Sequence, residues 1–267
     1  KYEPFLRLTA SQRKIAEDFI RRYSLSNEEL IIGINTGAAD RWPKSLSVNK
    51  TVMLINELYE KYKAKLILFG GPNEINRNRE IIKKVKVPII DTGCGNDLVE
   101  FPALVSICKI FITTDSLGLH VALALKRKTL ALIGPTSPSE IDMYEIGEKV
   151  VASSCICCYK NDCKSMESII IKEILNKFEK IIYEKITLGI TAFKEPDIER
   201  AIKSALNQKT TRKYNILISA PDKETLDIAE KYKKKHSNVS VFKDPGKGKS
   251  YALNLLFKNL KTDIVVL

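Results

Sequence analysis

Short runs of apolar and β-branched residues alternate along the chain with longer segments of helical periodicity. Helices are predicted from Ser11 to Tyr23 and from Val48 to Lys63, with Ser47 as the N-cap of the second. A long amphipathic helix follows at about 166–184. The strands expected between these segments are 30–35, 65–69, 88–91, 109–113, 129–133 and 149–151. Such alternation predicts βαβ units and a mostly parallel sheet.

The same alternation restarts at Lys185. The expected strands are 186–191, 215–219, 239–242 and 263–267, and the expected helices are 195–207, 223–235 and 249–260. We therefore predict an α/β fold with two Rossmann-like parallel-sheet domains in tandem, residues 1–184 and 185–267. The last strand is apolar, and a buried parallel strand normally leads into a loop that carries function. The second domain is thus expected to be truncated.

Polar, glycine-bearing loops follow several strands of the first domain. Parallel sheets hold ligands at these strand ends, where N–H groups at helix starts can bind phosphate. The loops offer small residues, hydroxyls, carboxylates and cations. The candidate donor-binding residues are Asn35, Thr36, Gly37, Arg41, Lys44, Glu74, Asp115, Ser116, Gly118, His120, Gly134 and Thr136.

Several of these candidates also have a simpler structural explanation. Asp115 is suited to cap a helix, and Glu74 fits an exposed turn. His120 lies on a helix, where a single histidine is more often packed or solvated than catalytic. Arg41 is equally compatible with a surface charge. The four loops taken together, rather than any one residue, favour nucleotide or nucleotide-sugar binding.

These loops resemble the heptosyltransferases, glycosyltransferase family nine, over about residues 1–183. The matching segments are 32–38 with 41–43, 68–71, 114–122 and 131–136. The resemblance implies the C-terminal, donor-binding half of a GT-B enzyme that binds a nucleotide-diphospho-sugar. It implies that Asn35 and Thr36 line the diphosphate, Glu74 faces the ribose and Asp115 faces the donor sugar. The acceptor-binding half, with the family's catalytic base, would lie before Lys1, so the catalytic residues stay unknown.

Residues 185–267 resemble the start of a family-two GT-A glycosyltransferase. Segment 186–195 is similar to its first strand and nucleotide-binding turn, and 201–208 and 248–254 to two of its helices. The resemblance implies nucleotide contacts by Glu195, Asp222 and Lys249, although Glu195 and Asp222 are equally suited to helix starts. It also implies that a complete domain binds a divalent metal, Mg²⁺ or Mn²⁺, through an Asp-x-Asp motif beyond Leu267. No cofactor is expected in the first domain.

Four of the six cysteines cluster between residues 155 and 163. The spacing Cys155-x2-Cys158-x4-Cys163 is that of a metal knuckle, with Cys157 as an alternative second ligand. A structural zinc site normally has four ligands, and no histidine is near in sequence. Zinc, an iron–sulfur cluster, reduced thiols and one local disulfide all remain open here, with thiols or a disulfide favoured.

The composition places the protein among globular proteins, with 44% hydrophobic residues and a formal net charge of +12. A basic surplus attracts nucleic acid, anionic lipid or phosphorylated substrates. Because arginine and aromatic residues are not interleaved, nucleic acid is not expected as a partner. The prediction is a glycosyltransferase fragment with a glycan or glycolipid acceptor. It is placed in the cytoplasm, with peripheral contact at the inner face of the membrane. A non-catalytic nucleotide-binding or scaffold module is the alternative.

Overall fold

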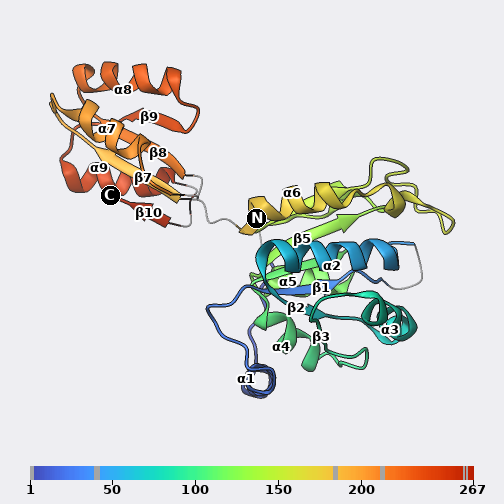
Figure 1. Cartoon of the computed structure of the whole chain (residues 1–267). Helices are drawn as coiled ribbons and strands as arrows, with labels where there is room; N and C mark the ends of the chain where they lie inside the picture. Colours follow the sequence, from blue (N-terminus) through green and yellow to red (C-terminus); the bar gives the residue numbers. More distant parts are fainter. Residues whose placement is uncertain (1–2, 39–42, 183–185, 211–213, 261, 263) are drawn as a thin grey trace. The chain divides into compact units, whose positions relative to one another are not determined.

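The chain forms two compact units, residues 1–182 and 183–267. A computed structural model describes residues 3–38, 43–182, 186–210, 214–260, 262 and 264–267 (Figure 1). Each unit contains a parallel β-sheet with helices packed against it. This arrangement confirms the predicted α/β fold with two parallel-sheet domains in tandem.

The first unit is built on a six-stranded sheet in the order β3-β2-β1-β4-β5-β6. Every adjacent pair of strands is parallel. The strands are β1 (Ile31–Asn35), β2 (Lys65–Leu68), β3 (Ile90–Asp91), β4 (Ile110–Thr114), β5 (Lys128–Ile133) and β6 (Gly147–Val151). The chain runs outward from β1 to β3 and then returns to β4 beside β1. Ligands of open parallel sheets bind at the carboxyl edge of such a reversal point.

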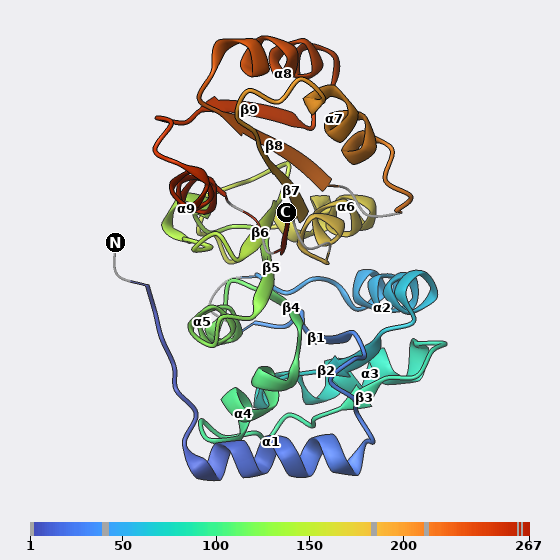
Figure 2. The ribbon, with the colours of Figure 1, turned by 90° about the vertical axis from the view of Figure 1, so that its left-hand side faces the viewer.

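Helices cover both faces of this sheet (Figures 1 and 2). The helices are α1 (Ala10–Arg22), α2 (Val48–Tyr62), α3 (Ile75–Lys84), α4 (Glu100–Ile107), α5 (Leu117–Ala124) and α6 (Ile171–Ile182). Side chains alternate across a strand, so Ile32 and Ile34 pack with α2 and α6. Ile31 and Phe111 point to the other face and pack with α1 and α4. Burial on both faces explains why these strands read as continuous apolar runs.

The helix predicted at 166–184 is shorter than expected and interrupted. A single 3₁₀ turn, Ser165–Ser168, precedes α6, and Ile169 between them is extended and fully buried. Lys50 reaches this break from α2, where its Nζ donates to the carbonyl oxygens of Glu167 and Ile169. These bonds satisfy carbonyls that a continuous helix would have paired internally. The interruption is therefore a tertiary effect of Lys50.

The sequence pattern does not predict α3 or α4. Residues 102–105 of α4 are all buried, so this short helix lacks the one-sided apolar stripe that marks a helix in sequence. It also contains Pro102, a residue that lowers helix propensity. In α3 a polar run, residues 76–80, follows Ile75, and only Asn78 and Ile81 are buried within the helix.

The second unit is a four-stranded parallel sheet in the order β10-β7-β8-β9. Its elements are β7 (Ile186–Thr191), α7 (Ile198–Leu206), β8 (Tyr214–Ala220), α8 (Lys223–Lys235), β9 (Val239–Lys243), α9 (Lys249–Asn259) and β10 (Ile264–Val266). Ile202 of α7 packs with Ile216 and Ile218 of β8 in the core. Within the parts of the chain described by the structure, no helix is long and apolar enough to cross a membrane.

Phe178 provides a test of the packing of α6 on the first sheet. Its ring is fully buried and lies 5.1 Å from the ring of Tyr62 on α2. We expect Phe178→Ala to lower the free energy of unfolding of the first unit by about 3–5 kcal/mol, because it opens a core cavity. The control Phe5→Ala, at a side chain that is 73% exposed, should change it by less than about 0.5 kcal/mol.

The measurement is urea unfolding followed by the hydrogen exchange of backbone amides in β1 and β4. These strands belong to the first unit, so the signal reports on that unit alone. Equal effects of the two substitutions would contradict the described packing of α6.

Candidate functional site

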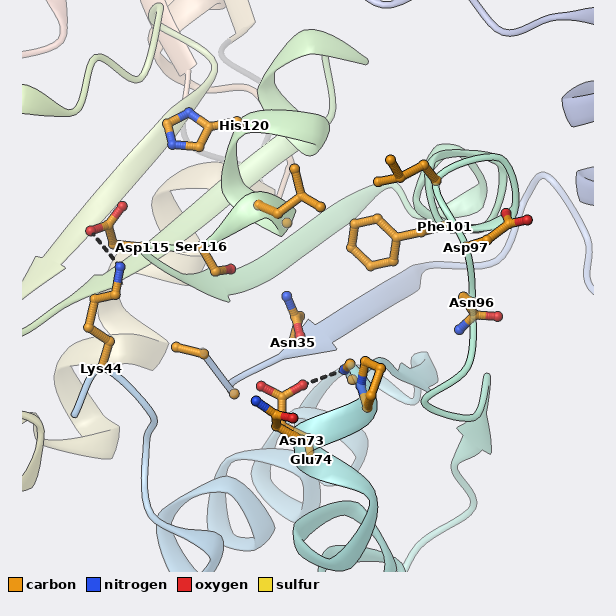
Figure 3. Close-up of a pocket in the computed structure, with 18 residues that line it drawn as sticks. Asn35, Lys44, Asn73, Glu74, Asn96, Asp97, Phe101, Asp115, Ser116 and His120 are labelled. Atoms are coloured by element: carbon orange, nitrogen blue, oxygen red, sulfur yellow. Dashed lines mark hydrogen bonds and ion pairs between the residues drawn. The ribbon is translucent and has the colours of Figure 1, made fainter. Parts of the chain in front are cut away.

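A cavity of about 580 Å³ opens at the carboxyl ends of the central strands of the first unit (Figure 3). Its volume is in the range of pockets that hold nucleotide-sized ligands. The lining residues follow β1, β2, β3 and β4: Asn35, Gly37, Ala38, Lys44, Gly70, Gly71, Pro72, Asn73, Glu74, Asn96, Asp97, Leu98, Phe101, Asp115, Ser116, Leu117, Gly118 and His120.

The structure brings together eight of the twelve residues predicted for the first domain. These are Asn35, Gly37, Lys44, Glu74, Asp115, Ser116, Gly118 and His120. Thr36, Gly134 and Thr136 do not line the cavity. Arg41 lies outside the described residues. Loops from separate strands converge because parallel strands end at one edge of the sheet.

Asp115 is held in place by two side chains from different loops. Its Oδ2 accepts a hydrogen bond from Thr136 Oγ1 at 2.9 Å and pairs with Lys44 Nζ at 3.2 Å. The Lys44 and Asp115 side chains are only 15% and 19% exposed, so water screens this ion pair weakly. The N-cap of α5 is Ser116, which argues against Asp115 as a simple helix cap. Thr136 therefore acts on the cavity by orienting the Asp115 carboxylate.

Glu74 is buried in the loop that follows β2, on the other side of β1 from Asp115. It ends the 3₁₀ turn Pro72–Glu74, and its Oε2 accepts a hydrogen bond from the backbone N–H of Gly71. Gly37 faces this carboxylate so closely that a Cβ at position 37 would overlap with Glu74 Oε1. Any side chain larger than hydrogen at position 37 would therefore force Glu74 to move.

The first turn of α5 packs against the end of β1. A Cβ at Gly118 would lie 2.5 Å from Asn35 Nδ2, so glycine lets the helix start approach this amide. Asn35 Nδ2 donates to Thr113 Oγ1 at 3.4 Å, and Ser116 Oγ lies 3.3 Å from the same hydroxyl. The N-terminus of α5 thus reaches the cavity, and His120 lies exposed one turn along (Figure 3).

The side chain of Thr36 is placed differently from the expectation that it lines a diphosphate. It is fully buried, and its Oγ1 lies 2.9 Å from Thr51 Oγ1 and accepts from Arg77 Nη2 at 2.9 Å. Arg77 also donates to the carbonyl oxygen of Leu46 at 2.6 Å. Burial is the main cause of a lowered pKa of this guanidinium, which nearby Glu74 partly offsets. Thr36 and Arg77 are thus internal supports of the loop after β1.

One wall of the cavity is absent from the sequence prediction. Asn96, Asp97, Leu98 and Phe101 line it after β3 and at the start of α4. The sequence did contain a signal for this wall. Gly93 and Gly95 follow the predicted strand 88–91 closely, and in a parallel sheet the loop after this strand lies at the same edge as the other loops. Figure 3 shows this wall and the Lys44–Asp115 pair on opposite sides of the cavity, with Asn35 between them.

Carboxylates outnumber cations among the described lining residues. Glu74, Asp97 and Asp115 carry negative charge, and Lys44 carries a positive charge that is paired with Asp115. A cavity of this kind suits a ligand with many hydroxyl groups, because carboxylates accept their hydrogen bonds. Among the lining residues, the start of α5 and Lys44 are the features that favour phosphate groups.

Two of the three residues predicted to contact a nucleotide in the second unit, Asp222 and Glu195, make hydrogen bonds at helix starts. Asp222 is the N-cap of α8: it accepts from the backbone N–H of Lys194 and Thr225, each at 2.9 Å. These hydrogen bonds lower the pKa of Asp222 to about 2. Glu195 Oε1 accepts from the N–H of Asp197 at 3.2 Å, and Lys249 is the exposed first residue of α9.

Two aspartates of the second unit have their carboxylate oxygens engaged in hydrogen bonds within the unit. Asp244 is buried, and its two oxygens accept from Ser219 Oγ and from the N–H of Gly246. The oxygens of Asp222 are also engaged by backbone N–H groups. Within the described chain, the one convergent group of metal-ligating side chains is Cys155, Cys158 and Cys163 of the first unit.

Comparison with known families shows to which family the chain belongs. The model of glycosyltransferase family 9 (heptosyltransferase) matches residues 3–171, well over half of the chain. The chain belongs to glycosyltransferase family 9. The model of glycosyl transferase family 2 matches the smaller segment 187–267. The two matches fall on the two compact units in turn.

Curated relatives of this family 9 chain include lipopolysaccharide and lipooligosaccharide heptosyltransferases. It is 34% identical over 125 residues to lipopolysaccharide heptosyltransferase 2 of Salmonella typhimurium, across 43% of this chain and 34% of that protein. It is 25% identical over 171 residues to lipooligosaccharide heptosyltransferase 2 of Campylobacter jejuni, across 60% and 52%. The chain thus spans about one third to one half of the length of these relatives.

Solved structures of the family share the fold. A family 9 glycosyltransferase from Veillonella parvula superposes with a TM-score of 0.60 at 19% identity, over 66% of this chain and 53% of that chain. The ADP-heptose lipopolysaccharide heptosyltransferase II of E. coli gives 0.55 at 22% identity, over 67% and 53%. At this identity the likeness establishes the fold alone.

The contact between Gly37 and Glu74 yields a prediction about the site. Gly37→Ala should lower the free energy of unfolding by about 1–3 kcal/mol, because the new methyl group forces the buried carboxylate away from the N–H of Gly71. Gly95→Ala is the control, since nothing lies within 4 Å of a Cβ there. Adding Glu74→Ala to Gly37→Ala should recover part of the loss. Chemical denaturation measures each variant, and a Gly37→Ala protein as stable as Gly95→Ala would refute the contact.

The capping role of Asp222 gives a pH prediction for the second unit. Because its folded pKa of about 2 lies below the unfolded value of about 3.9, the cap contributes its full stability above about pH 4. That contribution is lost as the pH falls toward 2. Carboxyl-carbon NMR titration should give a midpoint near 2 for Asp222, and Asp222→Asn should flatten the acid dependence of stability. A midpoint near 4 would contradict the two backbone hydrogen bonds.

Proposed function

We propose that the first unit binds a nucleotide-diphospho-sugar donor in the described cavity. The protein to which it belongs then transfers the sugar to a glycan or glycolipid acceptor. The carrying observation is that two positioned carboxylates, Glu74 and Asp115, face one cavity together with the start of α5. The family 9 match supports the reaction class, because its description names heptosyltransferases.

The lining residues suggest an order for the parts of the donor. The diphosphate lies at the N-terminus of α5, where free N–H groups and the helix dipole favour negative charge, and Lys44 adds a cation. Glu74 accepts hydrogen bonds from the ribose hydroxyls, as acidic residues do in dinucleotide-binding folds. Asp115 accepts from hydroxyls of the donor sugar. The nucleobase lies against the apolar side chains of Leu98 and Phe101. The neighbouring polar side chains of Asn96 and Asp97 are available for hydrogen bonds to the base.

The second unit is proposed as the first part of a family 2 glycosyltransferase, on the match to residues 187–267. The complete domain is proposed to bind a divalent metal, Mg²⁺ or Mn²⁺, through ligands other than Asp222 and Asp244, whose oxygens are engaged in hydrogen bonds. The proposal places the protein in the cytoplasm, at the inner face of the membrane, where a glycolipid acceptor would be reached by peripheral contact. The net charge of +12 is compatible with attraction to anionic headgroups.

Isothermal titration of the chain with nucleoside diphosphates and their sugar conjugates tests the first proposal. ADP, UDP and GDP are compared, because the cavity alone does not determine the base. We expect one of the three to bind at one molecule per chain, and its sugar conjugate to bind as well. If none of the diphosphates or conjugates binds, the proposed function is wrong.

The ribose assignment predicts a specific loss in one variant. Glu74→Gln should weaken nucleoside diphosphate binding roughly 10- to 100-fold, because a charged acceptor of two hydroxyl hydrogen bonds is lost. Glu80→Gln is the matched control: it lies on the adjoining α3, where its carboxylate pairs with Lys84 at the surface. A 2′,3′-dideoxy nucleotide should bind the wild type weakly and be insensitive to Glu74→Gln. Equal losses for the ribose and dideoxy nucleotides would remove Glu74 from the ribose site.

A further inference from the structure

Three cysteine sulfurs converge in the segment between β6 and the 3₁₀ turn Ser165–Ser168. The Sγ atoms of Cys155, Cys158 and Cys163 all lie within 4.8 Å of one another. Cys157 lies in the same segment but outside this group, and its Sγ is 4.0 Å from the carbonyl oxygen of Thr136. The fold therefore separates three of the four clustered cysteines from the fourth.

The spacing of the sulfurs is close to that of a single tetrahedral metal ion. With zinc–sulfur bonds of about 2.3 Å, two thiolates on one ion lie roughly 3.8 Å apart. The observed upper limit of 4.8 Å needs side-chain shifts of about 1 Å at most to reach this geometry. A disulfide joins only two sulfurs, at about 2.05 Å, and leaves the convergence of a third unexplained.

A backbone N–H group donates to the most buried of the three sulfurs. Cys163 is 7% exposed, and the backbone N–H of Ser165 donates to its Sγ at 3.3 Å. The hydroxyl of Ser165 is fully buried and lacks a hydrogen-bond partner among the described residues. Metal-bound ligands are typically oriented by such outer donors. The N–H of Ser165 is positioned to act as such an outer donor to Cys163 Sγ.

We propose that Cys155, Cys158 and Cys163 bind one Zn²⁺ ion as three thiolates, with solvent in the fourth coordination position. Binding releases the three thiol protons to solvent and forms three zinc–sulfur bonds, so no oxidant or reductant is needed. The exposed position of Cys155 leaves the ion accessible to water on one side. The role assigned to the ion is to hold residues 155–163 in place, and unlike a closed four-ligand site it keeps one position open to solvent.

The zinc-binding segment is bonded directly to the turn that orients Asp115. The backbone N–H of Tyr159 donates to the carbonyl oxygen of Pro135 at 3.1 Å, and its hydroxyl accepts from the N–H of Ser137 at 3.1 Å. Thr136, between these two residues, donates to Asp115. A metal ion that fixes residues 155–163 thereby also fixes the position of the Asp115 carboxylate.

Metal analysis of the chain and its variants tests the proposal. The wild type, loaded with Zn²⁺ under reducing conditions and freed of excess metal, should retain one zinc per chain. Co²⁺ in its place should show thiolate-to-cobalt charge-transfer absorption. Cys155→Ser, Cys158→Ser and Cys163→Ser should each weaken zinc binding by more than about 100-fold, beyond the loss seen when a residue that only supports a ligand is changed. Cys157→Ser is the matched control and should retain full stoichiometry.

Several results would overturn this assignment. They are sub-stoichiometric zinc in the loaded wild type, an equal loss in Cys157→Ser, iron with labile sulfide in the purified protein, and a disulfide between two of the three cysteines without reductant. The exposed Cys155 keeps the test decisive if Cys163→Ser fails to fold, because Cys155→Ser removes a ligand at the surface. Zinc stoichiometry is measured without nucleotide, so it does not depend on the proposed donor binding.

Discussion

The site of this protein depends on one carboxylate that three loops share. Asp115 follows β4, Lys44 follows β1 and Thr136 follows β5, and both partners meet the same oxygen, Oδ2. An ion pair on an exposed surface would contribute little to holding these loops together. Here the pair is mostly buried and the hydroxyl adds a second bond, so the three strand ends are connected at the cavity. The sheet supplies the approximate convergence, and Asp115 completes it.

The alternation of apolar runs and helical segments was enough to predict the sheet and its class. Strands such as β1 are buried on both faces, and this leaves an unmistakable apolar run. The pattern fails where the environment of a segment is unusual. Helix α4 is buried nearly all round and carries no polar stripe, and α6 is cut short because Lys50 binds the carbonyls of Glu167 and Ile169. In both helices the outcome depends on contacts with residues far away in the sequence, and local periodicity carries no information about such contacts.

The same distinction separates the site residues that could be predicted from those that could not. Glycines, carboxylates and hydroxyls after parallel strands are brought to one edge by topology, so the loops themselves were predictable. The direction of a single side chain was not. Thr36 follows Asn35 by one residue and turns into the core, where Arg77 of the unpredicted α3 binds it. The wall formed by Asn96 and Phe101 lies after β3, a strand that was predicted, but these residues come several positions beyond its end, and only the folded loop shows that they turn back to the cavity.

The cysteine segment supplies rigidity where the fold alone provides little. Residues 134–136 follow β5 as an irregular turn, and a Cβ at Gly134 would lie 2.5 Å from Met166 Sδ, so this turn is packed directly on the segment after the cysteines. Tyr159 binds the other side of the turn through Pro135 and Ser137. An irregular loop loses conformational entropy when it is ordered, at about 1–2 kcal/mol per residue. A metal ion bound by residues 155–163 would offset that cost for the turn that holds Asp115, and so join the fold of this segment to the chemistry of the cavity.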